Sequence, residues 1–198
     1  MTGVFDILTA FGLSGSAGLN AYLPLLVVAL LARFTHLIEL NEPWTALTSG
    51  WTIAVLGLLL LVETVADKIP AVNHANDVIQ TFIRPVAGAI LFAASTKVVG
   101  GIHPALAMVC GVLVAGSVHV VKSAAIRPAV TAVTAAPSGG VATVPANIAV
   151  STLEDIVALA TSLVAVIVPV LLALVLLIAV VAIAWWLLNQ QRARHAGA

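Results

Sequence analysis

Charged side chains are scarce in this 198-residue chain: Asp, Glu, Lys and Arg make up 8% of it, whereas 62% of the residues are hydrophobic. A water-soluble domain covers its surface with charged groups, and this chain has too few of them to coat a fold of its size. The eight basic and eight acidic residues also cancel, which leaves no field or basic patch that would attract nucleic acid. The sequence therefore predicts a protein surrounded by membrane lipids, with no nucleic-acid partner.

Cysteine is nearly absent. Cys110 is the sole thiol and lies in the apolar run 107–115, where we expect it to stay protonated and to fill space between helices. A single cysteine excludes an intrachain disulfide framework and a thiolate metal site. His74 and Asp77 have a spacing that suits metal ligation, but no third ligand clusters with them, so we predict no metal.

Motifs of known enzymes are missing as well. The chain has no HExxH, nucleophile elbow, Walker loop or dinucleotide fingerprint. Gly12, Gly15 and Gly18 do not form a phosphate loop, because no strand precedes them and no Lys-Ser/Thr pair follows. We predict neither enzymatic activity nor a cofactor, and we keep catalysis inside the membrane as a third hypothesis.

What the chain does have is a series of apolar segments that can cross a hydrocarbon layer. We predict an all-α, polytopic transmembrane bundle of about five spans, which forms one integral membrane domain over residues 1–198. The expected spans are 19–34, 51–66, 86–99, 104–121 and 156–188. Basic residues favour a cytoplasmic C-terminus by a small margin over the opposite or a dual topology. We expect a multi-pass protein of the cell inner (plasma) membrane.

The N-terminal region is interrupted. Residues 4–13 are apolar but too short to span, and a stretch rich in glycine and serine, 12–18, separates them from the next apolar run. Small residues at this density either break a helix or let another helix approach to backbone contact. Asn20 and Pro24 favour a broken or re-entrant segment, and simple helix packing is the alternative.

Three other segments are not simple spans. Polar residues recur at helical spacing in 74–84, which predicts an amphipathic helix at the membrane interface, with Pro85 starting or kinking the next span. Residues 129–150, rich in Ala, Pro and Gly, indicate a loop or re-entrant segment, and 189–198 form a polar tail. Ser151 and Glu154 match a capping box, so we expect the last helix to begin there.

Acidic side chains at the end of the second expected span suggest a polar path. Glu63 and Asp67 lie one turn apart and share a helix face, where the two carboxylates would repel and one would tend to hold a proton. With Asn20 and Lys68 they form our candidate polar path through the membrane. The alternative is a set of ion pairs with nearby lysines at the membrane edge.

Basic side chains suggest a second type of site. Our candidate contacts to an anionic lipid headgroup are Arg84, Lys97, His119, Lys122 and Arg127. His119 and Lys122 share a face, which gives the fourth expected span a cationic end. The alternative is the usual flanking of a span by positive residues.

Three segments carry a family resemblance: 14–24 (SGSAGLNAYLP), 62–70 (VETVADKIP) and 76–85 (NDVIQTFIRP). They resemble a family of small bacterial integral membrane proteins known only as a domain of unknown function. The resemblance implies that Asn20, Glu63, Asp67, Lys68 and Arg84 lie in characteristic segments of that family, as does Asp77. It implies no activity, substrate or cofactor, and residues 129–147 look less typical of it.

Two main hypotheses follow. The first is a small permease or channel-like transporter, in which the interrupted N-terminal region and the Glu63 face line a polar path for an unknown small solute or ion. The second is a membrane scaffold that binds anionic lipid or a polyprenyl phosphate and transports nothing. Either protein would have membrane lipids as partners and could form a homo-oligomer.

Overall fold

The computed structural model describes residues 2–67, 70–96, 103–126, 128, 129, 132, 143–167, 175, 178–180 and 185. This part of the chain is helical and contains no strand. Its elements are α1 (Thr2–Leu19), α2 (Tyr22–Phe34), the short 3-10 helix η1 (Trp44–Thr48), α3 (Gly50–Ala66), α4 (Pro70–Ser95), α5 (Pro104–Val121), the π-helical turn η2 (Lys122–Ile126) and α7 (Thr143–Ile167). Lys68, Lys97, Arg127, residues 130, 131 and 133–142 of the expected loop, and the 189–198 tail lie outside the described residues.

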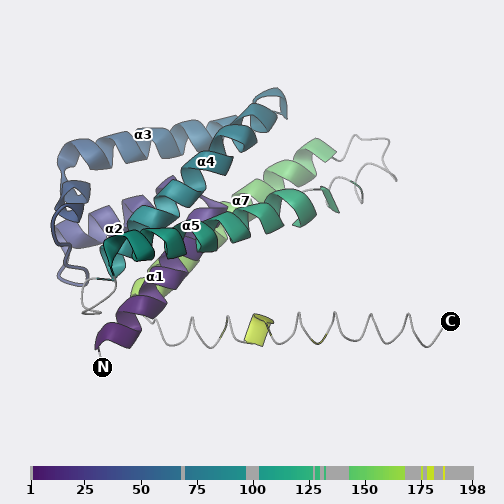
Figure 1. Cartoon of the computed structure of the whole chain (residues 1–198). Helices are drawn as coiled ribbons and strands as arrows, with labels where there is room; N and C mark the ends of the chain where they lie inside the picture. Colours follow the sequence, from purple (N-terminus) through teal and green to yellow (C-terminus); the bar gives the residue numbers. More distant parts are fainter. Residues whose placement is uncertain are drawn as a thin grey trace.

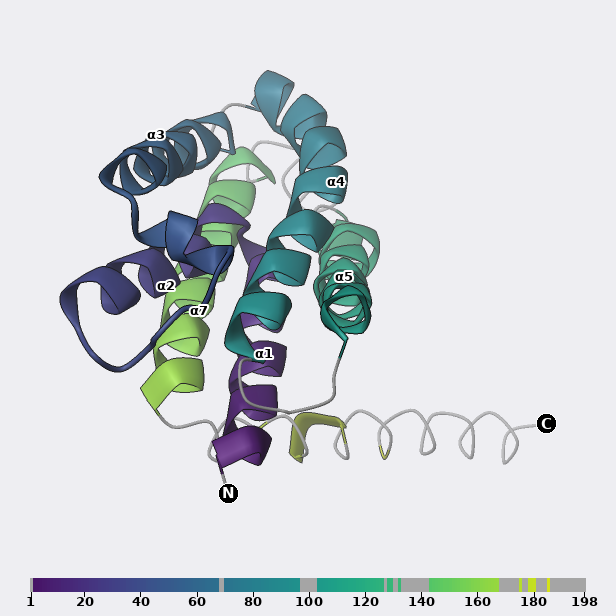
Figure 2. The same cartoon turned by 60° about the vertical axis from the view of Figure 1, so that its left-hand side comes forward.

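Helix α1 is the centre of the bundle and packs against α4, α5 and α7 (Figures 1 and 2). Its serine and threonine hydroxyls bond the backbone of neighbouring helices. Ser14 Oγ donates to the Gly88 carbonyl of α4 over 2.9 Å, and Ser16 Oγ donates to the Ala158 carbonyl of α7 over 2.7 Å. Small polar residues thus replace a bulky apolar interface, as is typical of helices packed in lipid.

Glycine permits the closest of these contacts. A Cβ on Gly111 of α5 would lie 2.7 Å from the Cα of Ala89 in α4, and one on Gly18 of α1 would lie 2.6 Å from the Ala115 carbonyl oxygen. Real Cβ atoms do not approach backbone so closely, so the helices touch through their backbones at these points.

Within the residues that the structure describes, three helical segments are long and apolar enough to cross a membrane: Asn76–Ser95, Pro104–Ala124 and Ile148–Ile167. The apolar helices α2 and α3 are shorter. These helices support a membrane protein, whereas the full number of about five spans stays a prediction.

The expected interruption near the N-terminus is present, but it lies at Asn20 and Ala21, between α1 and α2. The glycine- and serine-rich stretch before it is helical and serves close packing. The packing interpretation therefore applies to the end of α1, and the break applies to the two residues that follow it. No re-entrant segment is confirmed.

The segment expected to form a separate interfacial helix is instead the first half of α4, which continues through Pro85. Its polarity is opposite to that of a helix on a water surface: Gln80 and Arg84 are 1% and 0% exposed, while Phe82 is 73% exposed. The reversal has a simple cause. Lipid lies outside the bundle, so polar side chains gain by turning inward and apolar ones by turning outward.

The expected start of the last helix at Ser151 is wrong. Helix α7 begins at Thr143, within the region expected to be a loop. Pro145 lies in the first turn of α7, where the missing backbone N–H is tolerated because that turn has no intrahelical acceptor for it. Ser151 and Glu154 lie inside the helix and are buried, so they face partners in the bundle rather than cap a terminus.

Candidate functional site

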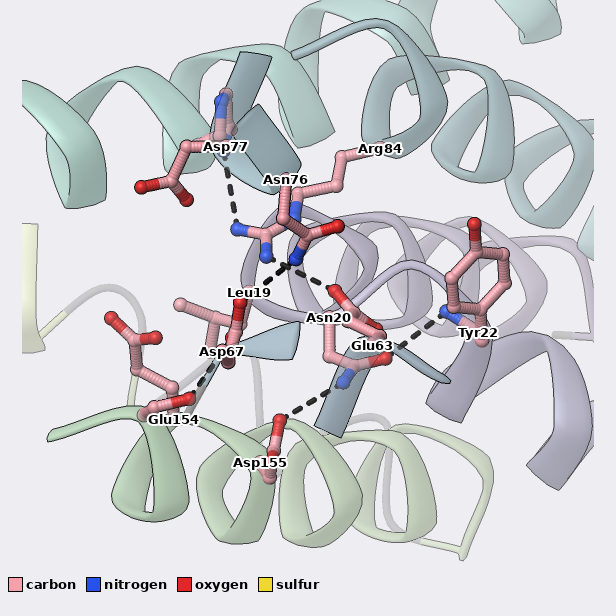
Figure 3. A network of polar contacts seen from close by, with 12 residues as sticks. Leu19, Asn20, Tyr22, Glu63, Asp67, Asn76, Asp77, Arg84, Glu154 and Asp155 are labelled. Carbon is pink, nitrogen blue, oxygen red and sulfur yellow. Dashed lines mark hydrogen bonds and ion pairs between the residues drawn. The ribbon is translucent and has the colours of Figure 1, made fainter. Parts of the chain in front are cut away.

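A buried polar cluster lies at the point where α1 ends and α2 begins (Figure 3). We define this polar cluster as Asn20, Glu63, Asp67, Gln80, Arg84, His119, Lys122, Ser151, Glu154 and Asp155. All of these residues are buried except Asp155, which is half-buried. They come from the α1–α2 junction, from the end of α3, and from α4, α5, η2 and α7. The cluster therefore joins helices that are distant in sequence.

Asn20 organises the break between the two N-terminal helices. Its Oδ1 accepts hydrogen bonds from the backbone N–H groups of Tyr22 and Leu23 over 3.1 and 2.9 Å, which satisfies two of the free donors at the start of α2. Its Nδ2 donates to Asp155 Oδ1 of α7 over 2.9 Å. One amide side chain therefore caps α2 and fixes the break to α7.

The C-terminal end of α1 holds two cations. The last carbonyls of a helix lack intrahelical donors and carry partial negative charge. Arg84 Nη1 donates to the Gly18 carbonyl over 3.4 Å, and Lys122 Nζ donates to the Leu19 carbonyl over 3.1 Å. The break between α1 and α2 thus exposes acceptors that help to keep two buried positive charges inside the bundle.

Each of these cations also forms an ion pair. Arg84 Nη2 lies 3.2 Å from Glu63 Oε1, which connects α4 to α3. Lys122 Nζ lies 2.7 Å from Glu154 Oε2, which connects η2 to α7. Because buried charges are costly without compensation, removing one member of either pair should destabilise the bundle far more than removing a surface charge.

The hydrogen bonds around His119 define its tautomer. Thr81 Oγ1 donates to the Asp77 carbonyl over 2.8 Å, so it accepts from His119 Nε2, 3.1 Å away. Arg84 Nη1 donates to His119 Nδ1 over 3.2 Å, and this nitrogen must therefore be the unprotonated one. His119 is thus a neutral imidazole that carries its proton on Nε2. The bonded chain runs from buried Arg84 to Thr81, which is exposed.

Asp67 joins the cluster from the C-terminal end of α3. Its Oδ1 accepts from Asn76 Nδ2 over 2.8 Å, and its Oδ2 accepts from Ser151 Oγ over 2.9 Å. Glu63, one turn earlier, bonds Arg84. The two carboxylates thus lie on one side of α3 but bond different helices.

The structure merges the two groups of candidate residues into one. Asn20, Glu63 and Asp67 of the candidate path lie in the same cluster as Arg84, His119 and Lys122 of the candidate headgroup site. The last three are 0%, 3% and 1% exposed, and they bond groups inside the bundle. Lys68, Lys97 and Arg127 lie outside the described residues.

Four members of the cluster were not among the predicted site residues: Gln80, Ser151, Glu154 and Asp155. The capping-box interpretation concealed two of them. A periodic signal was present in α7, because its small and polar residues follow helical spacing, and this stripe is buried. It consists of Ser151, Glu154, Ala158, Ser162 and Ala165.

Carboxyl groups outnumber basic side chains in the described part of the cluster. Its carboxylates are Glu63, Asp67, Glu154 and Asp155, and its described cations are Arg84 and Lys122. Among the residues that the structure describes, no group of three or more His, Cys, Asp or Glu side chains is placed to hold a metal ion.

The helices and this cluster together define a class: a helical membrane protein with a charged interior. Comparison with protein families gives a match over residues 7–190 to the family described as "Domain of unknown function (DUF4126)", and the chain belongs to this family. The match confirms the resemblance that the three N-terminal segments carry. Comparisons with curated proteins and with solved structures gave no match.

Proposed function

We propose that this protein is a small channel-like permease whose polar cluster carries protons through the membrane. The observation that supports this proposal most directly is the meeting of four carboxylates with two cations in the described part of the cluster. Burying a carboxylate inside a bundle costs several kcal/mol, and binding a proton is the smallest change that removes this cost. Titratable groups inside membrane bundles commonly belong to such proton pathways.

The broken helix supports the same function. Helices interrupted at membrane depth supply free backbone groups and helix ends around the binding sites of many transporters. Here the α1–α2 break at Asn20 lies beside the ion pairs of Arg84 and Lys122. The chain of bonds through His119 to the exposed side chain of Thr81 gives the cluster a connection to the surface of the bundle.

Burial of the basic residues favours transport over lipid binding. A lipid headgroup would need positive side chains at the surface, and those of Arg84, His119 and Lys122 are inside and bonded. We therefore propose a permease of the plasma membrane, with lipids around it and no catalytic role. We keep self-association as an expectation.

Proton flux into liposomes tests the proposal. Protein reconstituted into vesicles that contain a pH-sensitive dye should acidify them faster than protein-free vesicles when a potassium diffusion potential drives protons inward. Glu63→Gln should reduce this rate to that of protein-free vesicles, because the amide cannot exchange a proton. Glu63→Asp should retain part of the flux.

Glu42→Gln is the matched control, since Glu42 is exposed near η1, outside the cluster, and its loss should leave the flux unchanged. Two results would refute the proposal: wild-type protein that conducts no faster than protein-free vesicles, or a Glu63→Gln variant that conducts like the wild type. The thermal transition of each variant in detergent shows whether it is folded.

A further inference from the structure

Three polar atoms in one corner of the cluster are buried and have no hydrogen-bond partner: Glu63 Oε2, Gln80 Oε1 and Arg84 Nε. Their residues are at most 2% exposed. A buried polar atom without a hydrogen bond destabilises the folded state, so three such atoms on neighbouring side chains indicate a ligand.

These three atoms belong to one small region between α2, α3 and α4. Arg84 Nη2 contacts the other carboxylate oxygen of Glu63 over 3.2 Å. Gln80 precedes Arg84 by one turn of α4, so the two side chains lie on the same face. The Tyr22 side chain of α2 lies nearby, since it interacts with Gln80 and lies within electrostatic range of Glu63 and Arg84.

The chemistry of the three atoms selects the ligand. Arg84 Nε–H is a donor, whereas Glu63 Oε2 and Gln80 Oε1 are acceptors. A metal cation would face the guanidinium, and an anion would face the carboxylate. A water molecule accepts one hydrogen bond and donates two, and buried waters in proteins typically make about three bonds to groups of this kind.

We propose that Glu63, Gln80 and Arg84 bind one water molecule inside the bundle. The site itself follows from the three unbonded atoms. Its role, to give the Glu63 carboxyl an exchangeable hydrogen-bond partner, rests on the proposed transport of protons. The site therefore has a test that does not depend on flux.

Solid-state NMR of the full chain in lipid bilayers provides this test. With arginine labelled by ¹⁵N, the Arg84 Nε–H signal, assigned by its loss in Arg84→Lys, should receive magnetisation from water within the short mixing times typical of bound water. Gln80→Met removes one acceptor and fills the space, so this transfer should be lost. Thr64→Val is the control, because the Thr64 hydroxyl bonds the Leu60 carbonyl of its own helix.

The outcomes separate the two proposals. Absence of transfer in the wild type, or transfer that persists in folded Gln80→Met, overturns the water site. If Gln80→Met does not fold, the wild-type transfer decides alone. Magnetisation transfer without proton flux would support the water site and refute the transport function. Proton flux without magnetisation transfer would support the transport function and refute the water site.

Discussion

Removal of the Lys122 charge should destabilise the bundle through its partner Glu154. Lys122 is 1% exposed, and its Nζ bonds Glu154 Oε2 over 2.7 Å and the Leu19 carbonyl over 3.1 Å. In Lys122→Met the side chain keeps most of its length, but Glu154 loses the ammonium group that it bonds. Breaking a buried ion pair in this way costs about 3–5 kcal/mol, which corresponds to a decrease in melting temperature of about 10 °C for a chain of this size.

The double variant separates charge from packing. In Lys122→Met with Glu154→Gln neither charge is present, so most of the loss should be recovered. The remaining cost should be about 1–2 kcal/mol, because the Leu19 carbonyl still lacks its donor. If the double variant is as unstable as Lys122→Met, or if Lys122→Met melts within about 2 °C of the wild type, the ion pair does not stabilise the fold as we infer.

Cys110 offers a built-in assay for this cycle. It is the sole cysteine of the chain, and it lies partly buried against a small apolar cluster formed by Ala10, Phe92 and Ala107. A dye that fluoresces on reaction with thiols should therefore label it slowly in the folded bundle and quickly after unfolding. Heating each variant in detergent with this dye gives the melting temperatures directly.

Two other predictions concern backbone contacts. Gly111→Ala should lower the unfolding free energy by about 1–3 kcal/mol, because its Cβ would collide with the backbone of α4. Gly116→Ala is the control and should be tolerated, because its Cβ would lie 3.9 Å from Pro85 Cγ. Equal melting temperatures for the two variants would contradict the close packing. Asn20→Ala should lower the unfolding free energy by about 1–2 kcal/mol and speed hydrogen exchange at the first amides of α2, as measured by mass spectrometry. Exchange at Thr35, whose amide bonds the Leu31 carbonyl, should stay unchanged.

Part of the fold could be predicted from composition and local pattern. The start of α5 after His103 and the extent of α3 match the expected spans because a long apolar run, a proline and flanking polar residues are local signals. The interruption near Asn20 was also predictable. Its position depends on the partners that Asn20 finds in α7, and these are distant in sequence.

The arrangement of the candidate site could not be predicted in the same way. Lys122 and Glu154 form an ion pair between segments that are distant in sequence. Residues 143–150, expected to form a loop, are instead the first part of α7, the helix that carries Glu154. The polar face of α4 has the expected helical period, but period alone does not tell whether that face meets water or the interior. The direction of the polar face depends on tertiary packing, and Gln80 and Arg84 are buried in the interior.

The limited burial of α3 gives it a particular relation to charge. Of its residues only Leu56 and Glu63 are buried, and Trp51 is 83% exposed. Ile53 and Leu60 pack with Leu56 against the core, and the ion pair between Glu63 and Arg84 adds a charged contact between α3 and α4. Protonation of Glu63 would weaken this ion pair as well as neutralise the carboxylate, so the position of α3 and the ionisation of Glu63 should be thermodynamically linked.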